Sequence, residues 1–598
     1  MHLISSSRSQ NWLIAGIFAG IVLAATPLLA QDPPDASGRI GHLEGNVTVQ
    51  PNGVEDWEQA YNNMLVGPGD RVFAGPESLG EFQVGSVRAY FSAHTDLSLV
   101  DYNGQTIEYG QASGSVNYFA NGFYPGQSLF VSTPNGGIVS TRYSKFRVDV
   151  HPDLGWSQVT NGSDSPAITI SGAGGFSVTL LANQAVQIYG TNPVEGQPVP
   201  PLPGDEFQSW SYNLETHRQQ SPSAQYVNTE MEGYAELDNA GEWQAQSQYG
   251  PIWFPRVEAG WAPYHNGHWV HRPFFGWTWV ADEPWGAAPF HYGRWVAIGG
   301  RWAWIPGPRE GHPVWSPAQV VFAGGISVGG VGVSVWFPLG PGEAYKPWYP
   351  CTPEYINRIN ISNIRPAPAV HVQVNYVTIV NQTTNITYIN HTTVTAMNTS
   401  DFAAGRPATK VAVNVNVNLV EHVQPAAPAA PPPAKVVILH PAPKPQGVEA
   451  ARPVLINHEG KAVSTVPGAK PAAVPIKALP PKPAPPAVKP MATPAKPEAA
   501  PAKPEAKPMA APAKPEAKPM ATPAKPEMTP VKPEAKPAAK PEAAPAKPEA
   551  APAKPEPKPE ATPAKPAVKP EATPPAKDPK KKDEKKDEKK TPPPPPSF

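Results

Sequence analysis

The chain of 598 residues carries 48 Lys and Arg against 49 Asp and Glu, and its 83 prolines are unevenly placed. The net charge of −1 hides an asymmetry, because residues 423–598 hold 30 basic and 17 acidic residues while the preceding part holds 18 and 32. An acidic body (18 − 32 = −14) with a basic tail (30 − 17 = +13) argues against nucleic-acid recognition by the body, since phosphate binding needs Lys and Arg clustered beside aromatic side chains.

Residues 1–30 are typical of a secretory signal peptide. Arg8 precedes an apolar run, and "TPLLA" ends at Ala30. The run has about 14 residues where a membrane-spanning helix needs roughly 20, which favours cleavage near Gln31 over an uncleaved anchor. The sequence therefore predicts an exported protein of the periplasm or cell envelope, with no transmembrane span once the signal is removed.

Residues 31–200 are predicted to form an all-β domain. Short runs rich in Val, Phe, Tyr, Thr and Ile alternate with Gly, Asn and Pro, a spacing typical of a β-sandwich or flattened β-roll. Two of the breaks, "DYNGQ" (101–105) and "PNGGI" (134–138), contain the Asn-Gly pair that suits a tight hairpin turn. Residues 201–240 are predicted to be a linker with one helix, from Glu206 to about Arg218.

Residues 241–350 hold 13 of the 17 tryptophans. Three similar segments, at 249–263, 265–280 and 291–306, each place a Gly shortly before one Trp and a second Trp seven or eight residues later. Two short runs joined by a Gly-containing turn make a hairpin, so we expect a Trp-rich antiparallel hairpin meander, followed by a diverged fourth pair of strands.

Period-two alternation in these hairpins gathers tryptophans on one face of each strand. Burial of large rings as the core of a small domain accounts for most of them. The alternative is that some rings face solvent, where they would bind a glycan or a partner. The possible aromatic binding surface comprises Trp269, Trp277, Trp279, Tyr292, Trp295, Trp302 and Trp304.

Residues 351–422 are predicted to form Asn- and Val-rich strands. In "KVAVNVNVNLV", the side chains of Val411 to Leu419 alternate with those of Asn414, Asn416 and Asn418, which indicates one buried and one wet face. The only cysteine, Cys351, excludes an intramolecular disulfide and is expected in a short polar turn.

Residues 423–598 contain 49 of the prolines and cycle through "PAKPEA" and close variants. With few branched or aromatic side chains, this tail cannot bury enough surface to fold, and we expect a disordered, extended spacer. Two apolar islets inside it, "VVILH" (436–440) and "PVLIN" (453–457), are candidates for adding as strands to an exposed sheet edge.

Three parts of the chain resemble known families. "GHLEGNVTVQ", Gly69-Asp70, and "FVSTP" from Phe130 to Pro134 look like the FecR-type periplasmic domain of bacterial envelope proteins. The Trp-rich segment, with "HYGRW" and "WFPLGPGEAYKPWY", is similar to an uncharacterised Trp-, Tyr- and Gly-rich family that often follows such a domain. The tail is similar in composition to the Pro/Lys/Glu spacer of TonB.

A metal site and a glycosidase site are two hypotheses for which the sequence gives weaker support than for a structural role of the same residues. His265, His268 and His271 fall at three-residue spacing, but strand and turn geometry does not by itself converge three imidazoles on a metal. Asp282 and Glu283 form an acidic pair beside aromatic residues, yet adjacent strand residues point to opposite faces, and a glycosidase needs both carboxylates across one cleft. We therefore expect no catalytic residue, no metal and no cofactor.

The sequence as a whole predicts a non-enzymatic, exported bacterial envelope protein that binds or scaffolds through its β domains. The expected partners are an envelope protein or cell-wall glycan for the body, and anionic envelope material for the Lys-rich tail, with no nucleic acid. One alternative is a FecR-like ligand-sensing module that reports to a membrane partner. The other is a glycan-binding protein that uses exposed aromatic side chains.

Overall fold

The computed structural model is dominated by β-strands, as predicted. It describes residues 32–123, 126–245, 247–365, 376–381, 387–421, 424–430, 433, 435–447 and 454–465. The predicted signal peptide, part of the predicted Asn/Val-rich strands and the Pro/Lys/Glu repeats lie outside these residues. Within the described ranges, none of the helices has the length and apolar character needed to cross a membrane.

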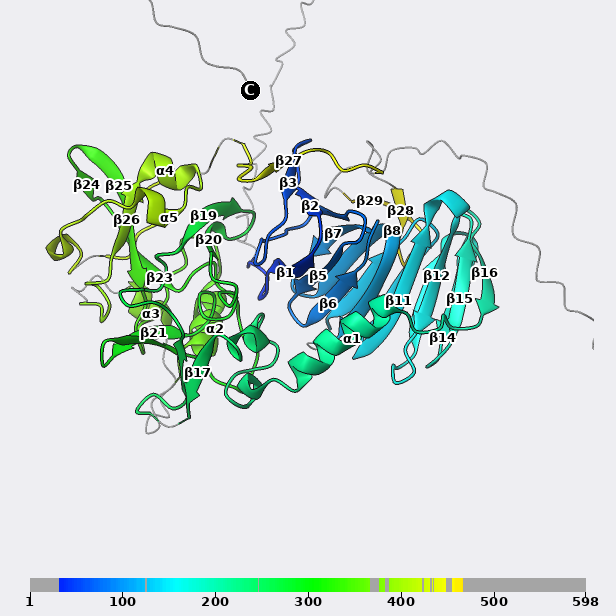
Figure 1. Ribbon diagram of the computed structural model, residues 1–598, viewed down its shortest axis with the longest axis horizontal. Coiled ribbons are helices and arrows are strands. Elements are labelled where there is room, and N and C mark those ends of the chain that lie inside the picture. Colours follow the sequence, from blue (N-terminus) through cyan, green and yellow to red (C-terminus); the bar gives the residue numbers. More distant parts are fainter. Residues whose placement is uncertain are drawn as a thin grey trace, which may run out of the picture. The chain divides into compact units, whose positions relative to one another are not determined.

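The strands of residues 38–199, here called the N-terminal β domain, pair almost entirely antiparallel and form two layers (Figure 1). The first layer contains β1 (Gly38–Glu44), β5 (Leu79–Val84), β6 (Val87–Phe91), β8 (Thr106–Ala120), β11 (Ser144–His151), β12 (Trp156–Asn161), β15 (Ala185–Tyr189) and β16 (Glu195–Val199). The second contains β3 (Trp57–Gln59), β2 (Val47–Gln50), β4 (Arg71–Ala74), β7 (Asp96–Tyr102), β9 (Ser128–Ser132), β10 (Gly137–Ser140), β13 (Ile168–Gly172) and β14 (Phe176–Leu180).

Strand β8 belongs to both layers, because its first half pairs with β7 and β9 and its second half with β6 and β11. The change occurs near Gly114, whose φ of +82° suits glycine. A Cβ at this position would lie 2.3 Å from the hydroxyl oxygen of Thr95. Glycine therefore lets one strand cross from one sheet to the other and close the domain into a flattened β-roll.

The core of the N-terminal β domain is mainly aliphatic. Alternate residues of each strand, such as Ile107 and Tyr109 in β8 and Leu129 and Val131 in β9, face the interior and are buried. The Asn-Gly turns lie where the sequence predicts them, between β7 and β8 and between β9 and β10. The predicted all-β domain is thus confirmed, and strands buried at every residue, such as β4 and β6, lie inside it beside strands with alternating burial.

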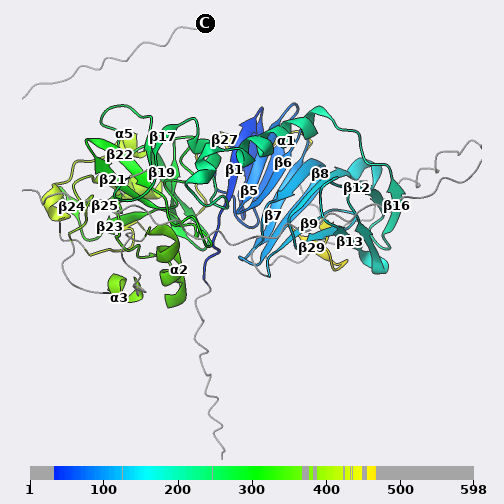
Figure 2. The same cartoon turned by 90° about the horizontal axis from the view of Figure 1, so that it is seen from below.

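The predicted helix in the linker is α1 (Glu206–Gln219), and it lies against the first layer in both views (Figures 1 and 2). The Asp205 side chain caps its first turn by accepting the backbone N–H of Gln208 at 2.7 Å. Two short 3-10 turns follow, η3 (Pro222–Gln225) and η4 (Tyr234–Leu237), and lead into the Trp-rich part of the chain.

The Trp-rich region, residues 241–350, contains the predicted hairpins at 265–280 and 291–306 as β19 (Gly267–Arg272) with β20 (Gly276–Ala281) and β21 (Arg294–Ile298) with β22 (Arg301–Ile305). The predicted fourth pair is β23 (Val320–Ala323) with β25 (Val331–Pro338), beside the short β24 (Ser327–Val328).

The segment at 249–263 differs from the expected hairpin. Only β18 (Ile252–Pro255) forms there, and it pairs with β17 (Gly241–Gln244) and β22, because the chain turns away after Pro255. The strands consequently form small separate sheets around one aromatic core instead of one continuous meander.

Residues 351–422 are where the strand prediction is wrong. The described residues of this segment contain α2 (Pro353–Asn363), α3 (Tyr376–Asn381), α4 (Thr399–Ala403), α5 (Ala408–Val411) and the 3-10 turn η5 (Val417–Leu419), and among them β26 (Thr395–Asn398) is the one strand. Residues 366–375 and 382–386, which include part of the predicted strands, lie outside the described residues. Thr352 caps α2 and Pro353 occupies its first turn, a local start signal that outweighs β propensity.

The alternation in "KVAVNVNVNLV" is nevertheless expressed as alternating burial. Val413, Val415 and Val417 pack partly buried against the aromatic core, while the Asn residues between them are exposed. An isolated bridge joins Ala412 to Met397, and no ladder follows it in the described residues. Leu419, which the pattern placed on the valine face, is exposed because η5 turns the chain there.

The prediction that residues 423–598 do not fold is wrong for three short segments of the described residues. Residues 425–430 contact the Trp-rich region, where Pro425 bridges to Ala323 and the carbonyl oxygen of Ala430 accepts the indole N–H of Trp277.

The other two segments lie at or directly after the apolar islets. The strand β27 (Pro441–Ala442) pairs with β3, next to His440. The Glu58 carboxylate accepts the backbone N–H groups of Leu439 and His440 at 2.8 and 3.1 Å. The second segment is a hairpin, β28 (Val454–Ile456) with β29 (Ala462–Ser464), bridged to Thr133. Both segments fold because the N-terminal β domain offers partners that the tail lacks.

Candidate functional site

The predicted aromatic binding surface is the interior of the Trp-rich region. Trp302 is partly buried, and the other six side chains are at most 4% exposed: Trp269, Trp277, Trp279, Tyr292, Trp295 and Trp304. The hypothesis that these six rings form a solvent-facing binding surface is therefore wrong. They are buried because three small sheets and the helices after residue 350 close over them from several sides.

Several indoles also donate hydrogen bonds to backbone carbonyls inside the core. The Nε1–H groups of Trp277, Trp295 and Trp304 donate to the carbonyl oxygens of Ala430, Pro289 and Tyr292 at 3.0, 2.9 and 2.7 Å. A buried carbonyl without a partner costs free energy, so these indoles stabilise irregular backbone as well as filling space. Their chemistry is accounted for by structural roles.

Trp269 lies at the centre of this core. Its ring packs against the rings of Trp279, Phe322, Trp336 and Phe402, with centroid separations of 5.4, 4.9, 5.5 and 5.4 Å. These neighbours come from β20, β23, β25 and α4, so one side chain joins elements more than 130 residues apart in the sequence.

The acidic pair does not face one cleft. The Asp282 side chain is half exposed, with a carboxylate oxygen 3.9 Å from Nδ1 of His268. Glu283 points inward, where its Oε1 accepts the indole N–H of Trp261 at 2.6 Å and burial raises its pKa to about 7. The two carboxylates thus occupy different environments, as expected for adjacent residues at the end of a strand.

The histidines at three-residue spacing have separate partners. His265 Nδ1 lies 3.2 Å from the hydroxyl of Thr395, and the His271 ring packs edge-on against Trp277. His291 is buried, which lowers its pKa to about 4, and its Nδ1 lies 2.8 Å from the carbonyl oxygen of Ser316. Across the part of the chain that the structure describes, no group of three or more His, Cys, Asp or Glu side chains is arranged to hold a metal ion.

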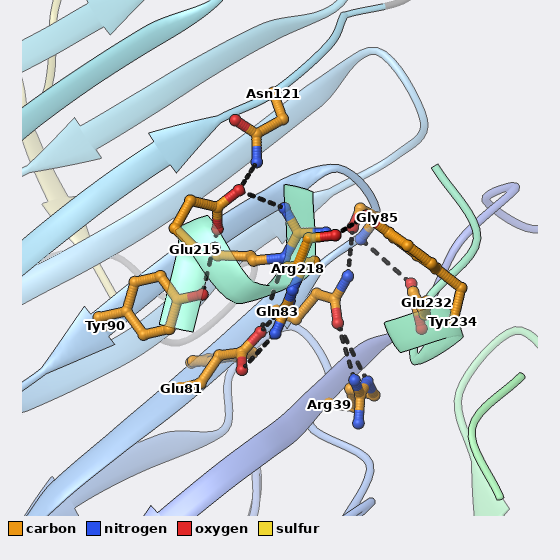
Figure 3. Close-up of polar contacts among 12 residues, drawn as sticks. Arg39, Glu81, Gln83, Gly85, Tyr90, Asn121, Glu215, Arg218, Glu232 and Tyr234 are labelled. Atoms are coloured by element: carbon orange, nitrogen blue, oxygen red, sulfur yellow. Dashed lines mark hydrogen bonds and ion pairs between the residues drawn. The ribbon is translucent and has the colours of Figure 1, made fainter. Parts of the chain in front are cut away.

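A buried charge network that the sequence analysis did not single out lies where α1 and η4 meet the first layer of the N-terminal β domain (Figure 3). We call it the junction network. It contains three arginines and four glutamates: Arg39, Arg88, Arg218, Glu81, Glu215, Glu232 and Glu236. If all seven were ionised, the network would carry a charge of −1 (3 − 4).

The α1 half of the junction network is built around Glu81 on β5. The Arg218 guanidinium binds both carboxylate oxygens of Glu81, at 3.1 and 3.0 Å. Arg88 lies between Glu81 and Glu215, at 3.7 and 3.6 Å. Glu215 also accepts the hydroxyl of Tyr90 at 3.1 Å, so the last turns of α1 are held to β5 and β6 by ionised groups out of water.

The η4 half is built around Arg39 on β1. Its guanidinium donates to Gln83 Oε1 at 3.1 and 3.0 Å, to Asn63 Oδ1 at 2.9 Å, and to Glu236 at 2.6 Å. The amide of Asn63 donates in turn to the carbonyl oxygens of Glu283 and Pro284, both at 3.2 Å. The η4 half therefore contacts the N-terminal β domain and the Trp-rich region together.

Glu232 is fully enclosed at this junction. Its Oε1 accepts the backbone N–H groups of Ser37 and Gly85, both at 3.1 Å. Burial raises its pKa to about 7, although Arg39 and the two N–H groups act in the opposite direction by favouring the carboxylate. Near neutral pH this carboxyl group is poised between its charged and neutral forms.

The segment before β1 forms a second attachment between the two parts. The Asp35 carboxylate accepts from Arg358 at 3.0 Å and lies 3.1 Å from His312 Nε2, while its carbonyl oxygen accepts the N–H of Trp315 at 2.8 Å. Asp32 accepts both the backbone N–H and the hydroxyl of Thr352, at 2.7 and 2.8 Å. Residues 32–37 thus attach the start of the N-terminal β domain to the Trp-rich region, and we call them the strap.

Part of the junction network has a sequence signal. In "EFQV" (81–84), Glu and Gln alternate with Phe and Val on a buried strand, which indicates a polar outer face that must meet a partner. Glu215 and Arg218 lie three residues apart on one face of the predicted helix. The pairing of these two faces, and the arrival of Glu232 and Glu236, depend on the path of the linker and are not readable from local patterns.

Comparison with known proteins gives limited matches. No curated protein matches this sequence. Among solved structures, three chains match, including crystal structures at 1.65 and 2.50 Å of a "putative anti-sigma factor" from Parabacteroides distasonis ATCC 8503. For both of these crystal structures the similarity has 10% identity and a TM-score of 0.20, and covers 22% of this chain and 59% of that chain.

The Trp-rich region, whose sequence is similar to an uncharacterised family, gives a family match. Residues 234–343 start in η4 and run through most of the Trp-rich region to the loop after β25. These residues match a protein family described as a family of unknown function, DUF6600.

Proposed function

We propose that the protein is a non-enzymatic, exported bacterial envelope protein, in which a FecR-type β domain and the Trp-rich region form one scaffold for binding, and a basic Pro-rich tail extends the reach of that scaffold. The observation that carries the proposal is the junction between the N-terminal β domain and the Trp-rich region, where several sets of buried contacts join the two. Buried ion pairs, the strap of residues 32–37 and an aromatic core made of structural rings all hold the body together.

The second part of the proposed scaffold is the tail, which is attached to the N-terminal β domain. Two segments near the start of the tail, at 439–442 and 454–465, pair with the N-terminal β domain. The lysines that follow are therefore tethered to that domain, where they would contact anionic cell-wall or outer-membrane material. Such contacts between exposed charges weaken with salt, because the screening length falls to about 8 Å at physiological ionic strength.

A charge test on the full-length protein examines this proposal. In one variant the seven lysines within residues 580–590 are changed to Gln, and in a matched variant the four acidic residues of the same stretch are changed to Asn or Gln. We expect retention on isolated envelope fractions to fall for the first variant and rise for the second, with both differences shrinking at high salt. Equal, salt-insensitive retention of all three proteins would refute the electrostatic role of the tail.

A ligand-sensing module that reports to a membrane partner is the second candidate. The junction network favours it, because ionised groups buried between two parts of a chain couple the position of one part to the other. Co-purification of the full-length protein with a membrane receptor would favour the sensor, and binding to isolated peptidoglycan would favour the scaffold. The glycan-binding alternative is not retained, since the six rings on which it rested most are buried.

A further inference from the structure

The hairpin of residues 454–465 packs closely on the second layer of the N-terminal β domain. We call the place where it packs the recess, because Gly110 and Gly137 leave room for it there. The N–H of Ile456 donates to the carbonyl oxygen of Thr133 at 2.7 Å. Leu455 is fully buried although it belongs to a two-stranded hairpin. The His458 ring stacks on Phe130 with a centroid separation of 4.0 Å and an interplanar angle of 12°. Backbone, apolar and ring contacts therefore all meet the same face.

The face that receives the hairpin is the outer side of β8, β9 and β10. Because strand residues alternate, the neighbours of core residues Ile107, Tyr109, Leu129, Val131 and Ile138 point to this side. Those neighbours are unusually small at three places, which are Gly110, Ser132 and Gly137.

Two of these small residues define the fit. A Cβ at Gly110 would lie 2.6 Å from a methyl carbon of Leu455, and a Cβ at Gly137 would lie 2.2 Å from the backbone nitrogen of His458. Neither glycine has a positive φ, so turn geometry does not require them. At Gly137 the three nearest atoms all belong to the bound segment, so its close approach explains the glycine. At Gly110 a Cβ would also lie 2.9 Å from Val100 in β7, so the domain itself contributes to the need for a small residue there.

The hairpin depends on this face for its order. Strands of three residues do not form a stable hairpin in water, so the recess supplies the stabilisation. The segment is tethered by the chain after His440, which is itself bound at β3, and such a tether gives an effective concentration on the order of millimolar. A tethered ligand of this kind occupies its site even when its intrinsic affinity is modest.

We propose that the recess is a peptide-binding site that residues 454–465 keep closed, and that it accepts in exchange a partner segment of the same chemistry. The partner is a short extended or hairpin segment that donates a backbone N–H to Thr133, places a leucine-type side chain over Gly110 and stacks a flat ring on Phe130. The proposal does not involve the lysines of the tail, so its failure and the failure of the envelope-tether proposal are distinguishable.

The test uses four full-length proteins and a fluorescent peptide with the sequence of residues 452–467. Leu455→Ser weakens the tethered ligand and leaves the recess intact. Gly137→Ala, added to Leu455→Ser, fills the recess. Gly204→Ala, added to Leu455→Ser, is the control, because this exposed glycine has an ordinary φ and its Cβ would come no closer than 3.9 Å to a neighbour. The fourth protein is the wild type.

We expect fluorescence anisotropy to show the peptide binding Leu455→Ser at least about tenfold more tightly than the wild type, since the tethered competitor is removed. The Gly204→Ala double variant should bind equally well, and the Gly137→Ala double variant should lose the binding. Equal binding by wild type, Leu455→Ser and the Gly137→Ala double variant would overturn the proposal, and so would the absence of peptide binding to Leu455→Ser.

Hydrogen exchange of the single Gly137→Ala variant gives a second measurement, in which the sequence of residues 454–465 is unchanged. Protection of the Ile456 amide should fall relative to wild type while protection of the core residue Ile138 in β10 is kept, which separates loss of docking from loss of fold. Unchanged protection of Ile456 would contradict the assigned fit. If the Leu455→Ser variant bound wild-type chains but not the free peptide, the proposal would be overturned. The site would then accept residues 454–465 of a second copy of this chain.

Discussion

The N-terminal β domain and the Trp-rich region both fill a core and satisfy buried backbone groups, but they use different side chains to do so. In the first, long strands satisfy the backbone through ladders, and aliphatic residues such as Val131 and Ile138 only need to fill space. In the second, strands are short and much of the backbone is irregular. There, buried indoles fill the core and also donate to carbonyl oxygens, as Trp304 does to Tyr292.

The difference explains why a surplus of tryptophan does not imply a ligand. A small region with little regular sheet leaves buried carbonyls without ladder partners, and an indole is a large apolar group that carries one donor. In the N-terminal β domain, the polar side chains instead gather at the outer face beside α1, where the junction network lies. In each region, the backbone geometry decides where buried groups lack hydrogen-bond partners, and the polar side chains lie at those places.

The first large effect expected is from loss of the central ring of the aromatic core. Trp269→Ala should lower the free energy of unfolding by about 3–5 kcal/mol, because a fully buried ring leaves a cavity between several elements. Trp302→Ala, at a partly buried ring of the same region, should cost less. Urea unfolding followed by near-UV circular dichroism measures both values. Equal costs would mean that the core is not organised around Trp269.

The next effect concerns the pH dependence of the junction. The folded-state pKa of Glu232, about 7, lies above its ordinary value of 4.5, so the folded state binds the proton more tightly than the unfolded state. This group therefore makes stability fall as pH rises from about 4.5 through 7. Glu232→Gln should remove on the order of 1–3 kcal/mol of that pH dependence.

Urea midpoints at pH 5 and pH 8 check this prediction. The variant should gain relative to wild type at pH 8, where the buried carboxyl is charged. Glu258→Gln, the same substitution at an exposed side chain, serves as the matched control. A wild-type protein that is more stable at pH 8 than at pH 5, with the same slope in Glu232→Gln, would contradict the assignment.

A smaller effect isolates the second role of the indoles. Trp304 and Trp279 are both fully buried, but only Trp304 has a hydrogen-bond partner for its Nε1–H among the described residues. Trp304→Phe should therefore cost about 1 kcal/mol more than Trp279→Phe, since it leaves the Tyr292 carbonyl oxygen unpaired. Parallel urea titrations provide the comparison, and equal costs would show that these rings act only by filling space.

The smallest effect is expected at the surface of the Trp-rich region. Arg301 and Glu242 form an ion pair at 2.7 Å, with both side chains more than half exposed. Arg301→Met should change stability by about 0–1 kcal/mol, whereas breaking the buried Arg218–Glu81 pair with Arg218→Met should cost about 3–5 kcal/mol. Thermal unfolding at low and high salt tests the contrast, because only the surface pair should be screened.

Much of the fold was predictable where periodicity was long and turns were marked. The strands of the N-terminal β domain, α1 and the hairpins around Trp269 and Trp295 all lie in the segments where they were predicted, and the strands are separated by the expected turn residues. The strand prediction for 410–420 was wrong because alternating burial also occurs in an extended segment that packs on a core without a ladder. The candidate site was predicted less well, because the burial of a ring depends on which elements cover it.

By itself, the sequence determined the all-β architecture, the helix in the linker, the division into an acidic body and a basic tail, and the concentration of aromatic residues in one region. These properties follow from local patterns of polarity, turn chemistry and composition. Only the tertiary structure decided that the tryptophans face inward, that seven ionisable groups meet at the junction, and that two segments of the tail bind the N-terminal β domain. Those outcomes require surfaces from distant parts of the chain to meet, and no local pattern specifies which surfaces will do so.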